Sequence, residues 1–332
     1  MKQEILSRIQ KKFPLSAKPF EVIAKELGIS EEEVLEILQN EKSESIIRQT
    51  SAIFDTKRLG YKSSLVAFKI DEDKIDDAVA IINSHPGVSH NYERNHEFNI
   101  WFTMAVAPDS KLGLDKTIET LAALTEAEDY IVLPTLKLFK INVKLNTTGK
   151  DDKKEKVKKV IHKDIELTPL HHEIIMRAQN DIDFVSEPFK NIVEELDIDY
   201  ETFFSILQEL QDAGVMRRFA SILNHRKAGF NANAMVVWDV DEENGAAIGE
   251  KAAAFSAVSH CYLRPKYENW PYNLFTMVHG KTTEETNAMI AEMAEEIESK
   301  SHMPLYSSRE FKKVRIEYFT PAFQEWEERY NG

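Results

Sequence analysis

The chain has 332 residues, of which 42% are hydrophobic and 30% charged, with a formal net charge of −14. This composition indicates packed cores and enough length for two or more domains. Cys261 is the only cysteine, which excludes an intrachain disulfide and a cysteine-rich zinc site. The acidic balance argues against a long contact with nucleic acid or an anionic membrane, and with no long apolar run or signal-peptide core we expect a cytoplasmic protein.

The chain begins with a helical pattern. Within residues 1–47, apolar residues recur at three- and four-residue steps from Phe20 to Leu27 and resume after a turn in which Ser30 is placed to cap the next helix. Residues 165–216 repeat this pattern. Both segments predict a helix-turn-helix module of winged-helix-like type.

A pattern of alternating strands and helices follows each module. In the first half the expected strands and helices are, in order, SSLVAFKID (strand), DKIDDAVAIINSH (helix), GVSHNYE (strand), FNIWFTMAVA (strand), KTIETLAALT (helix) and LKLFKINVKL (strand). The order βαββαβ is the ferredoxin-like arrangement. The second half repeats it from Asn233 to Phe319, so the predicted fold class is α+β.

The two halves are a tandem duplication. A shift of 169 residues aligns them over about ninety positions, and between them NTTGKDDKKEKVKKV is charged and almost free of large apolar residues, as in a solvated linker. We expect a first helix-turn-helix module at 1–62, a first ferredoxin-like domain at 63–147, a charged linker at 148–164, a second helix-turn-helix module at 165–231, and a second ferredoxin-like domain with a C-terminal tail at 232–332.

This architecture, with IIRQTSAIFDTKRLGYKSSLVAF joining module to sheet, resembles the Lrp/AsnC group of transcription regulators. The resemblance implies DNA binding, yet the candidate recognition helices, at 31–39 and 200–209, contain no Arg or Lys. Such helices need side chains that reach phosphates or base edges. We therefore expect both modules to pack or dimerise.

A second resemblance is closer. RRFASILNHRKAGFNANAMVVW, VSHCYLR, WPYNLFTMVHG and YSSREFKKVR in the second half are similar to segments of the siroheme decarboxylase family. The first half, with DTKRLGYKSSLVAFKI and YERNHEFNIWFTMAV, resembles the partner subunit of that family. The resemblance implies both subunit types fused in one chain. It also implies removal of the C12 and C18 acetate carboxyl groups of siroheme, giving 12,18-didecarboxysiroheme in alternative haem or haem d1 biosynthesis.

Siroheme carries eight carboxylates on a broad apolar ring. The resemblance therefore implies cationic clamps, for which the planar arginine fork is best suited, and aromatic side chains beside the ring. The expected substrate-binding residues are Arg217, Arg218, Arg226, Lys227, Arg264, Lys266, Tyr267, Trp270, Arg309 and Lys312. For Arg217 and Arg218 an alternative remains, because cations are also favoured at the end of a helix.

Loss of carbon dioxide from an acetate leaves carbanion character on the methylene carbon, which must then receive a proton. Histidine is the usual general acid near neutral pH. We expect His225, His260 and Tyr262 to be catalytic, although a histidine could instead ligate the iron and His260 also fits a structural role in a strand.

The first half has Thr56 where the second has His225. We therefore expect the second half to build the main site, with first-half contributions from Lys57, Arg58, His90 and Arg94.

We expect no metal site and no added cofactor, because siroheme brings its own iron. The expected ligands are siroheme and didecarboxysiroheme, with no nucleic acid and no membrane. The two halves would form an intramolecular pseudo-heterodimer, which could dimerise further. Two other functions stay open: a haem- or ligand-responsive regulator of Lrp/AsnC type, which specific duplex binding would identify, and a tetrapyrrole carrier, which would leave its ligand unchanged.

Overall fold

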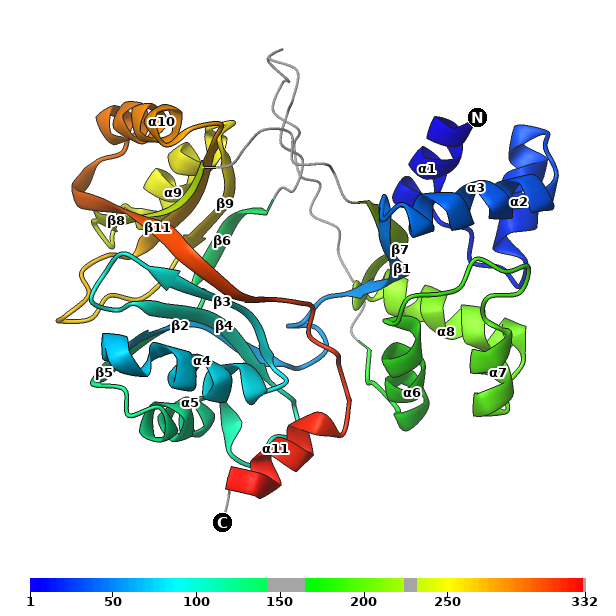
Figure 1. Cartoon of the computed structure of the whole chain (residues 1–332), viewed down its shortest axis with the longest axis horizontal. Coiled ribbons are helices and arrows are strands. Elements are labelled where there is room, and N and C mark those ends of the chain that lie inside the picture. Colours follow the sequence, from blue (N-terminus) through cyan, green and yellow to red (C-terminus); the bar gives the residue numbers. More distant parts are fainter. Residues whose placement is uncertain (142–164, 224–231, 331–332) are drawn as a thin grey trace. The chain divides into compact units, whose positions relative to one another are not determined.

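The computed structural model describes residues 1–141, 165–223 and 232–330, and it groups corresponding parts of the two halves (Figure 1). One unit contains the described residues within 1–61, 165–223 and 317–321; the other contains those within 62–141, 232–316 and 322–330. The two helix-turn-helix modules thus share one unit, and the two sheet domains share the other. In the described residues, no helix has the length and apolar character needed to cross a membrane.

The first unit holds six helices among its described residues. They are α1 (Lys2–Lys11), α2 (Pro19–Leu27), α3 (Glu31–Ser43), α6 (Pro169–Ala178), α7 (Lys190–Leu196) and α8 (Tyr200–Asp212). Ser30 caps α3 as the sequence predicts, because its hydroxyl accepts a hydrogen bond from the Glu33 amide at 3.2 Å. Strands β1 (Ile47–Phe54) and β7 (Met216–Leu223) pair antiparallel and join the two modules.

The second module covers part of helix α3. The Gln39 amide donates to the Phe184 carbonyl at 2.8 Å, and the Ser186 hydroxyl donates to the Glu31 carboxylate at 3.0 Å. Lys42 forms an ion pair with Asp181. These contacts give the candidate recognition helix of the first half a packing role within this unit.

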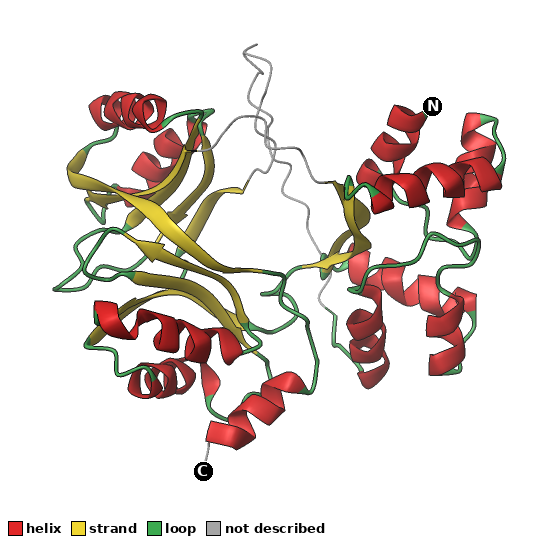
Figure 2. Cartoon of the chain, in the orientation of Figure 1, coloured by secondary structure: helices red, strands yellow, loops and turns green. Residues whose placement is uncertain are grey.

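The second unit contains two copies of the ferredoxin-like arrangement, so the predicted α+β duplication is confirmed. The first copy consists of β2 (Lys62–Lys69), a 3-10 turn (Glu72–Lys74), α4 (Ile75–Ser84), β3 (Val88–Arg94), β4 (Ile100–Val106), α5 (Gly113–Leu124) and β5 (Asp129–Leu133), followed by β6 (Lys137–Ile141). The second copy consists of β8 (Ala232–Val240), α9 (Gly245–Ala254), β9 (Val258–Leu263), β10 (Leu274–Gly280), α10 (Thr283–Glu296) and β11 (Ser299–Lys313), followed by α11 (Ala322–Tyr330). Figure 2 shows the helices of this unit on the outer side of its strands.

The strands described in this unit form one sheet in the order β5-β2-β4-β3-β11-β8-β10-β9-β6. The halves exchange β6 and the second part of β11. The first part of β11 pairs with β8 and its second part with β3, while β6 pairs with β9. Each half therefore completes the sheet of the other.

This exchange corrects one expectation from the sequence. LKLFKINVKL is not the last strand of the first ferredoxin-like fold, because the shorter segment DYIVL forms β5 and pairs with β2. Residues Lys137–Ile141 form β6, which pairs with the second half instead. Apolar alternation marks both segments as strands, but it does not show which strand each one pairs with.

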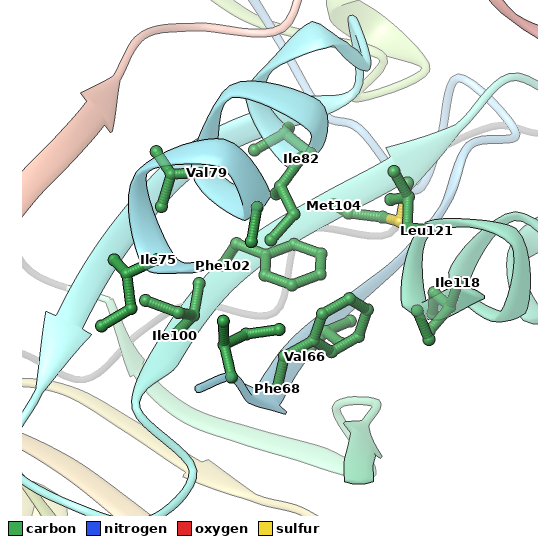
Figure 3. Packing of buried hydrophobic residues seen from close by; sticks show 14 of the residues in the cluster. Val66, Phe68, Ile75, Val79, Ile82, Ile100, Phe102, Met104, Ile118 and Leu121 are labelled. Atoms are coloured by element: carbon green, nitrogen blue, oxygen red, sulfur yellow. The ribbon is translucent and has the colours of Figure 1, made fainter. Parts of the chain in front are cut away.

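Apolar side chains fill both faces of the sheet. On the helix-covered face of the first half, α4 and α5 pack on β2 and β4 through residues such as Phe68, Phe102 and Ile118, all fully buried (Figure 3). The opposite face carries a cluster from both halves that includes Trp101, Leu305 and Trp270. We call this second cluster the shared core.

His85 is a buried, uncharged group in the turn before β3. Its ring lies edge-on to Trp326 at 4.5 Å, and its Nδ1 accepts from the Gly87 amide at 3.0 Å. Gly87 is required because an added Cβ would lie 1.8 Å from the Ala105 carbonyl oxygen. Burial, and to a lesser degree the charge of Lys312, lowers the pKa of His85 from 6.5 to about 3.

We predict that His85 makes the fold acid-sensitive. Between pH 6.5 and about 3 the unfolded chain binds a proton that the folded chain does not, so this group removes about 1.4 kcal/mol of stability per pH unit as the pH falls. Urea unfolding at pH 7, 6 and 5 measures the effect. His85→Asn keeps an acceptor near the Nδ1 position but cannot titrate there, and it should flatten the dependence by that amount; an equal slope in both proteins would contradict the assignment.

Candidate active site

The same three side chains follow one face of strand β3 and of strand β9 with the residue directly after it. They are His90, Tyr92 and Arg94 in the first half, and His260, Tyr262 and Arg264 in the second. Residues two apart in a strand point to the same side. The histidine and tyrosine rings stack, with centroids 6.3 Å apart in the first half and 6.2 Å apart in the second. We call these sets the first and second triads.

A β-bulge places a serine beside each triad histidine. Ser89 is the extra residue where β3 pairs with β4, and Ser259 is the extra residue where β9 pairs with β10. The hydroxyl oxygen of Ser89 lies 3.0 Å from His90 Nδ1, and that of Ser259 lies 2.8 Å from His260 Nδ1. Bulges re-aim side chains in this way beside many active sites.

Each triad arginine is buried, with its relative exposure only 7% for Arg94 and 8% for Arg264. Arg94 donates to the Leu305 carbonyl at 2.8 Å and Arg264 to the Leu133 carbonyl. Within the described residues neither forms an ion pair with a carboxylate, and the Nε atom of each lacks a hydrogen-bond partner. Burial lowers the pKa of both to about 10.

A buried, unpaired guanidinium is costly, because its desolvation is not offset by an opposite charge. A carboxylate ligand would supply that charge and occupy the spare donors. The Arg264 guanidinium also lies 4.9 Å from the centre of the Tyr262 ring and 5.3 Å from that of Phe275. These rings hold it in place, and the arrangement suits an anionic ligand.

The strand neighbours of the two triads differ. In the first half Glu310 lies opposite Tyr92 and Lys313 opposite His90. Burial, followed by the Glu310 carboxylate, raises the pKa of Tyr92 to about 12. A carboxylate in this position disfavours a second carboxylate from a ligand.

In the second half the corresponding neighbours are apolar and exposed. Leu138 lies opposite Tyr262 and Ile141 opposite His260, with relative exposures of 47% and 44%. The second triad therefore combines a buried cation, a histidine and exposed aliphatic surface, which together match an apolar ring that bears carboxylates.

The loop after β9 holds three further expected residues. Lys266 forms an ion pair with Asp239, and the Tyr267 hydroxyl donates to the Val132 carbonyl. Trp270 is 1% exposed and lies in the shared core, 5.3 Å from Trp101. In this structure these side chains attach the loop to neighbouring strands.

Two expected residues on β11 lie on the helix-covered side of the sheet. Arg309 pairs with Asp76 at 2.5 Å and with Glu93 at 3.6 Å. Lys312 donates to the Asn83 carbonyl at 2.8 Å. The structure does not bring them together with either triad.

The remaining expected residues lie in the first unit or outside the described residues. Arg217 pairs with Asp55 at 2.8 Å, Arg218 is exposed, and Arg58 donates to the Ala213 carbonyl at 3.0 Å, while Lys57 is exposed. The described residues contain no group of three or more His, Cys, Asp or Glu side chains placed to hold a metal ion. The expected residues outside the described ranges are His225, Arg226 and Lys227.

Sequence reasoning missed the residues around the second triad histidine, namely Ser259, His279 and Asn233. The repeated sequence VSH, at 88–90 and 258–260, was the available signal for the serine. His279 and Asn233 come from two other strands, so no local spacing pointed to them.

Comparison with known proteins identifies the family of this chain. A family model described as the AsnC-like ligand binding domain matches residues 58–140 and 227–312, and one described as the siroheme decarboxylase NirDL-like HTH domain matches 2–48 and 171–217. A siroheme decarboxylase of Hydrogenobacter thermophilus is 40% identical over 97% of this chain and 96% of its own length. A siroheme decarboxylase beta subunit of Methanosarcina barkeri is 40% identical over 43% of this chain and 95% of its own length.

A solved structure shares the whole architecture. The crystal structure of the siroheme decarboxylase NirDL in complex with an iron-uroporphyrin III analogue covers 99% of this chain and 98% of its own, with a TM-score of 0.82 and 34% identity. The match extends over both modules and both sheet domains. With this likeness in sequence and structure along its full length, the chain belongs to the siroheme decarboxylase family.

Proposed function

We propose that this enzyme removes the carboxyl groups of the C12 and C18 acetate side chains of siroheme, giving 12,18-didecarboxysiroheme and two molecules of carbon dioxide. The observation that carries the proposal is Arg264, a buried guanidinium whose Nε has no hydrogen-bond partner and which lies against Tyr262. His260 is on the same face of the strand, and exposed apolar side chains lie opposite His260 and Tyr262. A relative named siroheme decarboxylase, which matches nearly the whole chain, supports the proposal.

The residues of the second triad and their neighbours have separate roles in the reaction. Arg264 binds a carboxylate of the substrate and orients the ring, while Leu138 and Ile141 contact its apolar face. When the bond to the leaving carboxylate breaks, its electron pair stays on the methylene carbon, and His260 delivers a proton to that carbon. Tyr262 stacks on His260 and limits its movement.

No cofactor is added in this proposal. The reaction balances with a proton in and carbon dioxide out at each acetate, and siroheme carries its own iron. The two halves act as a pseudo-heterodimer within one chain, in line with relatives that use separate subunits.

We predict that anaerobic incubation of the purified chain with siroheme yields two successive products. Mass spectrometry should show losses of one and then two carbon dioxide units. A tetrapyrrole that binds but keeps its mass would overturn the proposed activity and leave a carrier.

We predict that Arg264→Met separates binding from stability. Methionine roughly fills the space of the side chain but brings no charge, so affinity for the iron-uroporphyrin III analogue should fall about tenfold to a hundredfold through loss of a charge-assisted hydrogen bond. The free energy of unfolding should not fall, because an uncompensated buried charge is removed. Absorbance titration and urea unfolding measure the two quantities.

Arg8→Ala is the control, because Arg8 pairs with Glu26 far along the chain from either triad. It should leave the affinity unchanged. Unaltered affinity in Arg264→Met would remove Arg264 from the binding site.

We predict that His260→Ala and His225→Ala both lower turnover more than they weaken analogue binding. A general acid contributes roughly a hundredfold or more to the rate. Single-turnover kinetics at saturating siroheme compares the two variants. Wild-type turnover in His260→Ala would reassign the proton donor to His225, and wild-type turnover in His225→Ala would remove His225 from the chemistry.

A further inference from the structure

Four polar side chains, linked by hydrogen-bonding distances, lead from the start of β8 to the histidine of the second triad. Asn233 Oδ1 lies 2.7 Å from His279 Nδ1, and His279 Nε2 lies 2.5 Å from Ser259 Oγ. Ser259 Oγ in turn lies 2.8 Å from His260 Nδ1. We call these side chains the relay.

Three neighbouring strands build the relay. His279 on β10 lies directly opposite Asn233 on β8, so both side chains share one face. The bulge in β9 then places Ser259 on that same face, beside His260. In a regular strand Ser259 and His260 would point to opposite faces, whereas the bulge leaves both between Val258 and Cys261, which lie on the helix-covered side.

The chemistry of the groups gives the relay one direction. An amide oxygen only accepts, so His279 Nδ1 carries the hydrogen and its Nε2 is an acceptor. Ser259 therefore donates to His279, and its oxygen accepts from Nδ1–H of His260. In the neutral side chain, Nε2 of His260 is then left without a hydrogen.

The first half has no histidine at the position of His279. Ala105 stands opposite Ser63, as His279 stands opposite Asn233. A methyl group cannot accept the hydroxyl hydrogen of Ser89, so the residue at this position does not orient the contact between Ser89 and His90. This difference adds to the one between the strand neighbours of the two triads.

We propose that His279 and Ser259 are positioning residues that hold His260 in its Nδ1–H tautomer, so that Nε2 is the nitrogen that takes up a proton from solvent and delivers it to the substrate. This inference rests on the proposed decarboxylation. There, the carbon–carbon bond to the carboxylate breaks, its electron pair remains on the methylene carbon, and the proton on Nε2 forms the new carbon–hydrogen bond.

Two substitutions of His279 test the relay. The side-chain amide of glutamine reaches the position of Nε2, so His279→Gln can still accept from Ser259. The shorter side chain in His279→Asn reaches only the position of Nδ1 and leaves Ser259 without that acceptor. The two variants are similar in polarity and differ in reach.

The first measurement is independent of catalysis. Nitrogen NMR of the full-length protein labelled with 15N-histidine reports the tautomer of each ring, and His260→Gln identifies the His260 signals. We expect the Nδ1–H form in the wild type and in His279→Gln, and a mixture of tautomers in His279→Asn. A wild type in the Nε2–H form, or no change in His279→Asn, would overturn the proposal.

The second measurement is turnover of siroheme. We expect kcat to fall roughly tenfold to a hundredfold in His279→Asn, by analogy with the range found for outer-shell partners of metal-binding histidines. KM should be unchanged, and His279→Gln should keep most of the activity. His302→Ala is the control, since His302 is exposed and stacks on Trp238. Equal losses in the Gln and Asn variants would assign His279 a merely structural role.

The two measurements also separate the inference from the function on which it rests. If the wild type releases no carbon dioxide, the proposed function fails and the catalytic part of the inference fails with it, whereas NMR still decides the tautomer. If His279→Asn does not fold, the wild-type tautomer and the His279→Gln kinetics remain decisive.

Discussion

The exchange of terminal strands is the interaction on which the sheet-bearing unit depends. Strands β3 and β9 are the second strands of their ferredoxin-like folds, and each would otherwise be an open edge. Backbone hydrogen bonds from β11 and β6 close these edges. Both triads lie on the strands held in this way, so the candidate site has support from both sides, which favours a fixed geometry.

The shared core follows from the same exchange. Once the strands of both halves join in one sheet, Trp101 from one half and Trp270 from the other become buried together. Arg94 and Arg264 lie next to this core and are buried from solvent. The arginines lower the stability of the free protein, and a bound carboxylate would offset that cost. Natural proteins tolerate such conflicts with stability mainly at functional sites.

Much of the fold could be predicted because the chain is a repeat. Helical periodicity located the modules, and comparison of the halves placed His90 with His260 and Arg94 with Arg264. The partners of the strands could not be predicted, since β5 and β6 carry similar local patterns and differ only in what they pair with. Two register shifts in β11 turn Arg309 and Lys312 towards the helices, and a one-residue slip of this kind leaves no mark in composition. The relay joins residues from three strands, and only the folded sheet brings them together.

The tandem arrangement has a consequence for how such a site can change. In a symmetric homodimer every substitution appears in both subunits, so a residue useful in one copy is imposed on the other. Here the halves are encoded separately within one chain, and β6 and β11 keep them assembled whichever side chains the triads carry. Ala105 can therefore occupy in one half the place that His279 holds in the other. The covalent link holds the two copies in a one-to-one ratio, so a substitution in one half needs no counterpart in the other.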